Sequence, residues 1–253
     1  MTAAPPSTDQ RLAVRQRPAD QKPVMRQRWG GLLFLHWQVD PQEIQRRLPT
    51  GLHVDTFENK AWLGVVPFFM QRVRPVFLPP LPRLSWFLEL NVRTYVHDSS
   101  GRPGVWFFSL DCNQPLAVEI ARRRFHLPYE HASMHTAFRN SKVEYTCRRK
   151  NADGPAATYE YPLPTHTKPA DEGSLEWFLV ERYLLFSSDR QGNLHSGQVH
   201  HTPYQIQQAP ESTGSTLPLR WNNFTEPVIP PASTLIANPV DVEIFPLKAC
   251  GKR

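Results

Sequence analysis

Cysteine is scarce in this chain, and the positions of its cysteines exclude a disulfide framework. The 253 residues include three cysteines, Cys112, Cys147 and Cys250, which lie far apart and form no CxxC pair. Domains that depend on disulfides carry their cysteines densely and in even numbers. We therefore expect free thiols in a reducing compartment.

Long apolar runs are also missing. No stretch approaches the ~18 uninterrupted apolar residues of a transmembrane helix. The proline- and glutamine-rich N-terminus lacks the apolar segment of a secretory signal. The sequence thus predicts a cytoplasmic protein with no membrane partner.

Motifs that bind common cofactors are absent as well. The chain has no GxGxxG fingerprint, P-loop or GxSxG elbow. His131 and His135 lie four residues apart, but no HExxH motif and no third ligand with zinc spacing accompanies them. We predict neither a cofactor nor a metal, and we interpret His201 as a histidine on the rim of a pocket.

The net charge of +6 is concentrated near the N-terminus. Residues 1–30 hold six basic and two acidic side chains, and residues 1–23 are polar and contain prolines. This composition predicts a disordered basic tail over 1–23 and a single domain over 24–250. The short basic runs at 122–124 and 148–150 lack a nucleic-acid motif, so we expect no nucleic-acid partner.

The 26 prolines argue against long helices and favour many strand ends and turns. We predict a mainly β (α+β) fold, a barrel-like or sandwiched sheet with a few short flanking helices. The predicted strands span residues 29–39, 52–73 (a hairpin turning at 58–60), 86–96, 104–112, 132–139, 142–149, 157–163, 182–188, 194–202, 204–209 and 240–247. Short helices are predicted after Pro41, over 115–125 with Asn113 as its cap, and after Ser174. In the second helix Leu116, Ala117 and Ile120 are predicted to face inward.

Residues 75–84 hold four prolines in ten residues and must form an extended loop. The loop is either a connector packed by its leucines or a flap over a ligand site.

The predicted strand 86–96 contains the most informative pattern. Side chains alternate between the two faces of a strand, which places Glu89, Asn91, Arg93 and Tyr95 together on one face. Either that face meets water, or it lines a polar lumen where Arg93 can reach Glu89 and pair with it. The pattern alone leaves both interpretations open.

Two further segments carry candidate polar groups. Asp111 lies at the end of strand 104–112, where it is either a site carboxylate or a cap for the next turn. Glu181 and Arg182 begin another strand, as an internal ion pair or a surface one.

Several separated segments, in order, resemble the YqjF-like family of uncharacterised conserved bacterial proteins. They are LPTGL, AWLGVVPF, FLELNVRTYV, GVWFFSLDCNQPLAVEIARRRFHLPY, FLVERYLLF and GQVHHTPY, within residues 25–210. This family is similar to a distant branch of the acetoacetate decarboxylase-like superfamily. The resemblance implies an antiparallel β-barrel with flanking helices and an internal cavity.

The enzymes of that superfamily use a buried lysine that forms a Schiff base with a keto acid. The matching stretch here, 110–117, contains no lysine, and none of the seven lysines has an apolar context. We therefore expect no Schiff-base chemistry.

Three functions remain open from the sequence, the last of them a structural or protein-interaction module with the basic N-terminal tail as a tether. The first is binding of a small acidic or carbonyl-containing metabolite, with Arg93, Asn91, Tyr95, Glu181, Arg182 and His201 as ligand-binding candidates. The second is a lysine-independent isomerase, hydratase or decarboxylase of a small oxo acid, with Glu89 and Asp111 as catalytic candidates. Whether the chain forms a homo-oligomer is left open.

Overall fold

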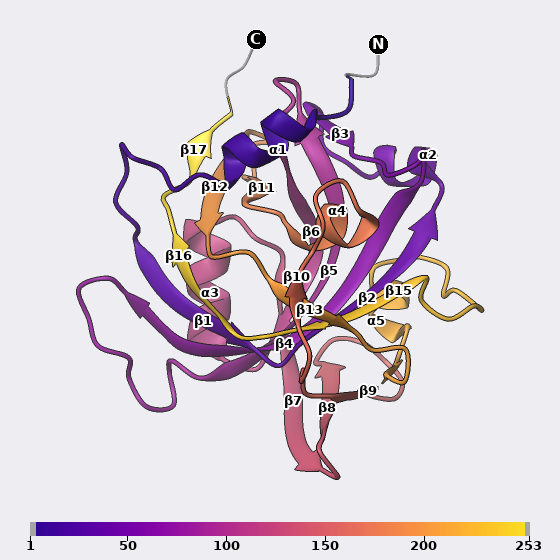
Figure 1. The fold of residues 1–253 in the computed structure, drawn as a ribbon. Helices are drawn as coiled ribbons and strands as arrows, with labels where there is room; N and C mark the ends of the chain where they lie inside the picture. The colour runs from indigo at the N-terminus through magenta and orange to yellow at the C-terminus, as the bar shows by residue number, and fades with distance from the viewer. Residues whose placement is uncertain (1–3, 251–253) are drawn as a thin grey trace.

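The structure is a computed structural model that describes residues 4–250 (Figure 1). Its strands are β1 (Met25–Gly30), β2 (Leu32–Val39), β3 (Leu52–Val54), β4 (Ala61–Pro75), β5 (Phe87–Asp98), β6 (Pro103–Cys112), β7 (Tyr129–Arg139), β8 (Lys142–Arg149), β9 (Ala157–Pro162), β10 (Lys168–Pro169), β11 (Leu184–Ser188), β12 (Leu194–His200), β13 (Gln205–Gln208), β14 (Thr213–Gly214), β15 (Ser233–Ala237), β16 (Val240–Ile244) and β17 (Lys248–Ala249). Its helices are α1 (Thr8–Arg15), α2 (Pro41–Gln45), α3 (Pro115–Arg124), α4 (Leu175–Val180) and α5 (Leu217–Trp221). The mainly β fold with few short helices is confirmed.

The strand pairings close on themselves. β1 pairs with β4, β4 with β5, β5 with β6, β6 with β11, β11 with β12, β12 with β16, and β16 again with β1. A strand in such a circuit turns one face toward the enclosed interior and the other face outward. β5 therefore has one row of side chains inside the circuit and one row outside it.

The sheet is mixed, which corrects the prediction of a purely antiparallel one. β6 pairs in parallel with β11 near its start and with β7 near its end, both on the edge opposite β5. The cause lies in the connection, because α3 carries the chain from the end of β6 back alongside it, and a crossover through a helix makes the next strand parallel. β7, β8 and β9 then form an antiparallel meander that packs on the outer face of β5.

Glycine and turn residues explain where two predicted strands break. The predicted strand 29–39 divides at Gly31, whose φ is +54°, and a Cβ there would lie 2.5 Å from the Phe69 ring. The predicted hairpin turn is present, with Glu58 and Asn59 both at positive φ. However, β3 then pairs with β5 instead of β4.

Helix α3 is present where predicted, but its cap and its buried face differ. Gln114 caps the helix by accepting a hydrogen bond from Leu116 N, whereas Asn113 accepts one from Leu88 N and ties the helix to β5. Within α3 the buried residue is Val118, and Leu116 and Ile120 are exposed. Two of the three residues predicted to face the core therefore face outward, whereas Ala117 packs partly against the core.

The N-terminal segment forms a helix where disorder was predicted; residues 1–3 lie outside the described residues. Ser7 and Gln10 form a capping box that begins α1. At the other end, Gln198 Nε2 donates to the carbonyl oxygens of Val14 and Gln16, at 2.7 and 2.8 Å. α1 buries no residue completely, but Val14 packs partly against the core, and polar contacts that the composition did not reveal hold the rest.

Asp55 links α1 to the rest of the molecule. Its buried carboxylate lies 2.6 Å from Arg182 Nη1 and 2.7 Å from Arg11 Nη1. Burial alone raises the pKa of Asp55, but Arg182 and Arg11 outweigh burial and the pKa is lowered. Asp55 is therefore ionised at neutral pH. It forms an ion pair with Arg11 and another with Arg182, and these three residues make one ion cluster.

Among residues 4–250, no helix is both long enough and apolar enough to cross a membrane.

We predict that Asp55→Ala destabilises the protein far more than Arg11→Ala. Removing Asp55 leaves Arg182 buried without a carboxylate, which costs about 3–5 kcal/mol. Removing Arg11 leaves the Asp55–Arg182 pair in place, and we expect a loss of about 1–3 kcal/mol. Urea unfolding monitored by tryptophan fluorescence measures both values.

The matched control is Arg17→Ala, which removes an ion pair of the same segment with the partly exposed Glu243. Its effect should stay below about 1 kcal/mol. Equal losses in Arg11→Ala and Arg17→Ala would contradict a special role for the Asp55 cluster.

Candidate functional site

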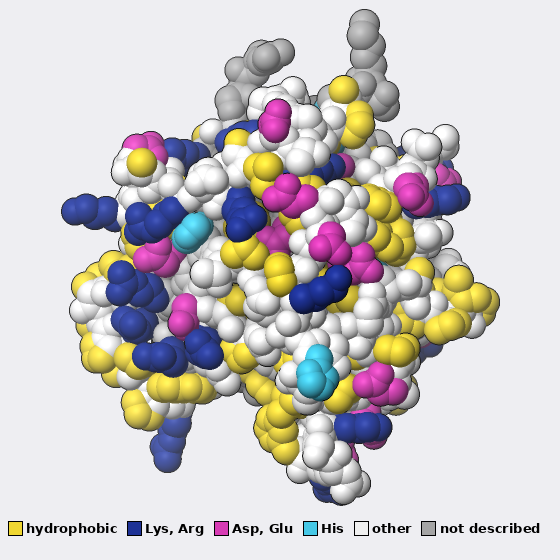
Figure 2. Space-filling view, in the orientation of Figure 1, with side chains coloured by type: hydrophobic (Ala, Val, Ile, Leu, Met, Phe, Trp, Pro, Cys, Tyr) yellow, Lys and Arg dark blue, Asp and Glu magenta, His cyan; other side chains and the backbone are white. Residues whose placement is uncertain are grey.

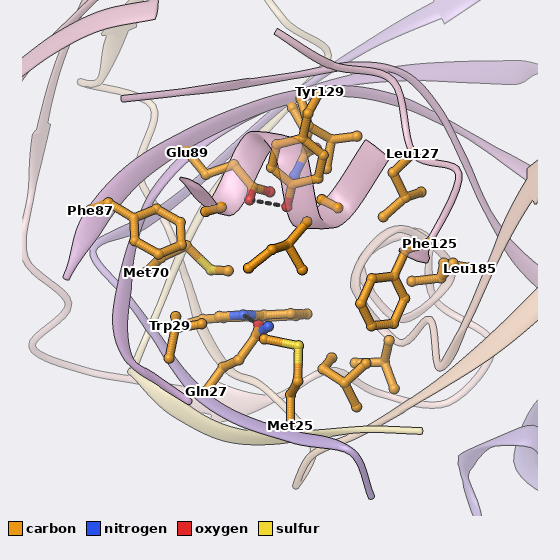
Figure 3. A pocket seen from close by; sticks show the side chains of 18 of the residues that line it. Met25, Gln27, Trp29, Met70, Phe87, Glu89, Phe125, Leu127, Tyr129 and Leu185 are labelled. Carbon is orange, nitrogen blue, oxygen red and sulfur yellow. Dashed lines mark hydrogen bonds between the residues drawn. The ribbon is translucent and has the colours of Figure 1, made fainter. Parts of the chain in front are cut away.

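A cavity of about 1000 Å³ lies inside the circuit of strands. Its walls are mostly apolar and come from β1, β2, β4, β5, β6, α3 and the segments around them. Figure 3 shows Trp29, Met70, Phe87, Phe125 and Leu185 arranged around the space. Ligand sites typically combine such walls with a few polar groups.

Glu89 is the acidic group of this cavity, and it points inward from β5 (Figure 3). Its side chain is almost fully buried, and its Oε2 accepts a hydrogen bond from Tyr129 Oη at 2.6 Å. Burial raises the pKa of Glu89 to about 7, although the hydrogen bonds from Tyr129 and Asn91 oppose the shift. A carboxyl group with this pKa exchanges a proton near neutrality.

Arg93 lines the same cavity but does not pair with Glu89, contrary to the expected ion pair. Its guanidinium lies over the rings of Phe34 and Tyr95, at 5.4 and 5.6 Å, and Nη2 donates to the Leu179 carbonyl at 3.3 Å. Among residues 4–250, no carboxylate lies within 4.0 Å of this guanidinium, and its buried Nε has no hydrogen-bond partner. The cavity therefore contains a cationic donor that the protein leaves unpaired.

Asn91 and Arg182 add two further polar groups to the cavity. Among the described residues, Asn91 Oδ1 and Arg182 Nη2 are buried and have no protein partner. Burial lowers the pKa of Arg182 to about 10, and the nearby Asp55 keeps it from falling further. Arg182 is thus still charged at neutral pH, with one of its nitrogens free for a ligand.

Tyr95 and His201 lie outside the cavity wall. Tyr95 Oη contacts the fully buried His36 Nε2 at 2.7 Å. His201 packs against the rings of Tyr183 and Tyr204 and lines a smaller cleft near Arg26. Burial lowers the pKa of His201 to about 4, so this ring is neutral at pH 7.

Glu181 does not pair with Arg182. It accepts hydrogen bonds from Tyr183 Oη and, at 3.0 Å, from Tyr204 N, while Arg182 turns to Asp55. The ion pair between Glu181 and Arg182 that the sequence suggested is therefore absent. Each side chain instead belongs to its own buried network of polar contacts.

Asp111 lies on the opposite side of the sheet from the cavity. The pairing of β5 with β6 skips Phe108, since Val92 pairs with Ser109 and Arg93 with Phe107. This bulge reverses the alternation within β6, so that Phe107 and Leu110 line the cavity. Asp111 instead binds Arg149 of β8 through two hydrogen bonds, at 2.6 and 2.9 Å.

Tyr129 is a site residue that the sequence analysis missed. It is the first residue of β7, and the parallel pairing of β7 with β6 places it opposite Leu110. The signal was available as a strand, a capped helix and a second strand in succession, the pattern of a crossover unit.

Residues 26–241 match the DUF2071 family, described as an uncharacterized conserved protein. The chain belongs to this family. It is also 38% identical over 186 residues to the uncharacterized protein YqjF of Bacillus subtilis (strain 168), and the alignment covers 74% of this chain and 76% of that protein. The resemblance identified from the sequence is confirmed.

Solved structures similar to this DUF2071 protein show the acetoacetate decarboxylase-like fold. Acetoacetate decarboxylase from Legionella pneumophila superposes with a TM-score of 0.60 at 14% identity, covering 93% of this chain and 91% of that one. An acetoacetate decarboxylase-like enzyme from Sphingomonas wittichii RW1 gives 0.61 at 11% identity, covering 92% and 95%. The enduracididine biosynthesis enzyme MppR, in complex with pyruvate, gives 0.53 at 12% identity, covering 92% and 90%. At these identities the likeness concerns the fold alone.

We predict that Glu89 makes the stability of this DUF2071 protein depend on pH. Its folded-state pKa of about 7 lies above the unfolded value of about 4.3. Between these pH values the folded protein holds a proton that the unfolded chain has released, so this contribution to stability falls as pH rises toward 7. Glu89→Gln keeps the neutral form and should gain stability relative to wild type by up to about 3 kcal/mol between about pH 4.5 and 8.

Urea unfolding of both proteins across this pH range measures the difference. Glu58→Gln, in the exposed turn before β4, is the matched control and should show almost no pH-dependent difference. A constant difference between Glu89→Gln and wild type across the range would disprove the raised pKa.

Proposed function

We propose that this DUF2071 protein binds, inside a barrel formed by the closed circuit of strands, a molecule with an apolar body and a carbonyl or carboxylate group. The proposal rests on one observation: within residues 4–250, charged groups of the cavity lack the partners that would normally neutralise or solvate them. Arg93 has no carboxylate partner among the described residues, and Glu89 has a pKa near 7. A ligand oxygen would give Arg93 the charge-assisted hydrogen bond that the protein does not supply.

Glu89 acts differently on the ligand on the two sides of its pKa. Below pH 7 it is protonated and can donate a hydrogen bond to a carbonyl or carboxylate oxygen. Above pH 7 its negative charge repels an anionic ligand within the same low-dielectric cavity. Binding of an acid should therefore weaken as Glu89 ionises.

The walls support an apolar body for the ligand. A cavity of about 1000 Å³ lined by aromatic and aliphatic side chains exceeds what a three- or four-carbon acid fills. Apolar surface buried there contributes about 25 cal/mol per Å². The proposed ligand is therefore larger and more amphiphilic than the small metabolite expected from the sequence.

The lining of the cavity does not favour a reaction through a lysine Schiff base. None of the residues that line it between positions 4 and 250 is a lysine; Lys252 lies outside the described residues. The proposal accordingly does not include a Schiff base.

We predict that Arg93→Ala weakens binding of a carboxylate probe much more than binding of its uncharged analogue. The probes are the fluorescent fatty acid cis-parinaric acid and its methyl ester. Losing one charge-assisted hydrogen bond should raise the Kd of the acid by about 10- to 100-fold at about pH 6 and leave that of the ester within about threefold.

Arg148→Ala, an exposed arginine on β8 outside the cavity, is the matched control, and circular dichroism checks the fold of each variant. If wild type binds neither probe, the proposed ligand class is wrong. If Arg93→Ala binds the acid as tightly as wild type, Arg93 is not the anchor.

A second function, acid–base catalysis, is favoured by the Glu89–Tyr129 pair itself. A carboxylate with a pKa near 7 can remove a proton next to a carbonyl group, and Arg93 can stabilise the negative charge that develops on the carbonyl oxygen. Removal of that proton gives the enolate; Glu89 then exchanges the proton with solvent and returns a solvent proton to the same carbon, so that the net result is proton exchange without any cofactor.

We predict that wild type catalyses exchange of the C3 protons of 2-oxooctanoate in D₂O, and that the rate rises with pH through about 7 as Glu89 ionises. Glu89→Gln should reduce the rate at least about 100-fold while leaving binding intact. Proton NMR follows the exchange, with Glu58→Gln as control. No acceleration by wild type over buffer would remove the catalytic interpretation and leave the binding one standing.

A further inference from the structure

The mouth of the cavity is surrounded by apolar side chains that face solvent. Six of them line the cavity and are exposed, and we call them the mouth patch: Phe77, Leu78, Leu81, Leu84, Leu116 and Ile120. Phe77 is 80% exposed. Soluble proteins seldom expose large apolar side chains in a contiguous group, and such groups mark interaction surfaces.

Two segments form the mouth patch, and a hydrogen bond joins them. Four members belong to the proline-rich loop between β4 and β5, and Leu116 and Ile120 lie on the outer face of α3. Gln114 Nε2, at the start of α3, donates to the Arg83 carbonyl oxygen of the loop at 2.9 Å. The loop projects beyond the strands at the lower left of Figure 1.

Arginines without acidic partners accompany the mouth patch. Arg74 and Arg124 line the cavity mouth, and Arg83 precedes Leu84 in the loop. Within residues 4–250, none of these three arginines has a carboxylate within 4.0 Å, although the chain forms many such pairs elsewhere. Figure 2 shows hydrophobic side chains beside Lys or Arg side chains at the lower left, where the loop projects.

The acidic residue of α3 does not cancel this charge. Glu119 lies within 4.0 Å of Arg122 and Arg123 on its own helix, and of His131. Two arginines therefore already compensate its single negative charge. The mouth patch remains an apolar surface bordered by net positive charge.

We propose that the mouth patch docks on an anionic lipid bilayer, with the apolar side chains entering the interface and Arg74, Arg83 and Arg124 contacting lipid phosphates. Apolar loop tips with flanking cations are the combination that binds such surfaces, because burial and electrostatic attraction add. The sequence analysis expected no membrane partner because it considered only segments that cross a bilayer.

Charge argues against a second copy of this chain as the occupant. A two-fold interface through the mouth patch would bring the same arginines of both copies face to face, which is unfavourable without intervening acids. A bilayer with anionic lipids supplies the complementary charge instead. The inference does not depend on the identity of any ligand in the cavity.

The test is co-sedimentation of the full chain with vesicles of dioleoyl-phosphatidylcholine, alone or with about 30% dioleoyl-phosphatidylglycerol, at about 0.1 M NaCl. We expect wild type to bind the anionic vesicles at least about tenfold more tightly than the neutral ones, and to dissociate at high salt.

Two double variants separate the contributions. Arg83→Glu with Arg124→Glu should lower the partition coefficient at least about 25-fold, because each arginine near an anionic surface contributes about fivefold. Phe77→Ser with Leu78→Ser should lower it about tenfold through lost apolar contact. All four side chains are exposed, so the fold should tolerate these changes.

The matched controls lie elsewhere on the surface. Val228→Ser with Ile229→Ser removes two exposed apolar side chains of the loop before β15, and Arg46→Glu reverses an exposed arginine after α2. Both controls should bind as wild type does.

Equal binding to neutral and anionic vesicles, or full binding by the mouth-patch variants, would overturn the proposal. So would a dimer, detected by light scattering, that Phe77→Ser with Leu78→Ser dissociates while wild type fails to bind vesicles; the patch would then be a self-association surface.

Discussion

The hydrogen bond from Tyr129 to Glu89 holds a carboxyl group inside an apolar cavity, where water cannot fully solvate its charge. Ionisation there is costly, and one hydrogen bond of 2.6 Å only partly compensates for the lost hydration. Both partners are fixed by the backbone, since Glu89 belongs to the continuous strand β5 and Tyr129 begins β7 directly beside β6. The parallel crossover through α3 thus sets the chemistry of the cavity as well as its shape.

Two arginines line the same cavity, but one has a carboxylate partner and the other has none among the described residues. Arg182 is held by Asp55, which Arg11 also contacts, so its charge is compensated within the fold. Arg93 lies over two aromatic rings, which attract a cation only weakly, and no carboxylate of the described residues neutralises it. Unpaired buried charge lowers stability unless something else supplies a partner. Because of this contrast, the proposed function assigns the ligand anchor to Arg93, whereas Arg182 is a structural element of the fold.

Local patterns revealed part of this arrangement, and long-range pairing decided the rest. The period-two alternation of β5 correctly grouped Glu89 and Arg93, because a regular strand keeps its faces. Asp111 was a candidate because of its position at the end of a strand, but it faces away from the cavity, and the bulge at Phe108 that decides its direction shows only when the partner strand is known. Leu116 has the spacing of a core residue of a helix, yet it is exposed because nothing within residues 4–250 covers it. Sequence periodicity reports which side chains share a face, but not what that face meets.

The mouth and the interior of the cavity both contain arginines that no carboxylate within residues 4–250 neutralises, so they carry charge of the same sign. At the mouth, Arg74 and Arg124 lie among exposed apolar side chains. Deeper inside, Arg93 lies between aromatic rings and has no carboxylate partner among the described residues. A molecule with an anionic or carbonyl head and an apolar body meets attractive groups at both depths, whereas a cation meets repulsion at both. Glu89 modifies this field according to its protonation, since its ionised form cancels part of the positive potential inside. The ligand proposed above, with its anionic or carbonyl head, fits this distribution of charge, and the proton on Glu89 would adjust how strongly the cavity attracts it.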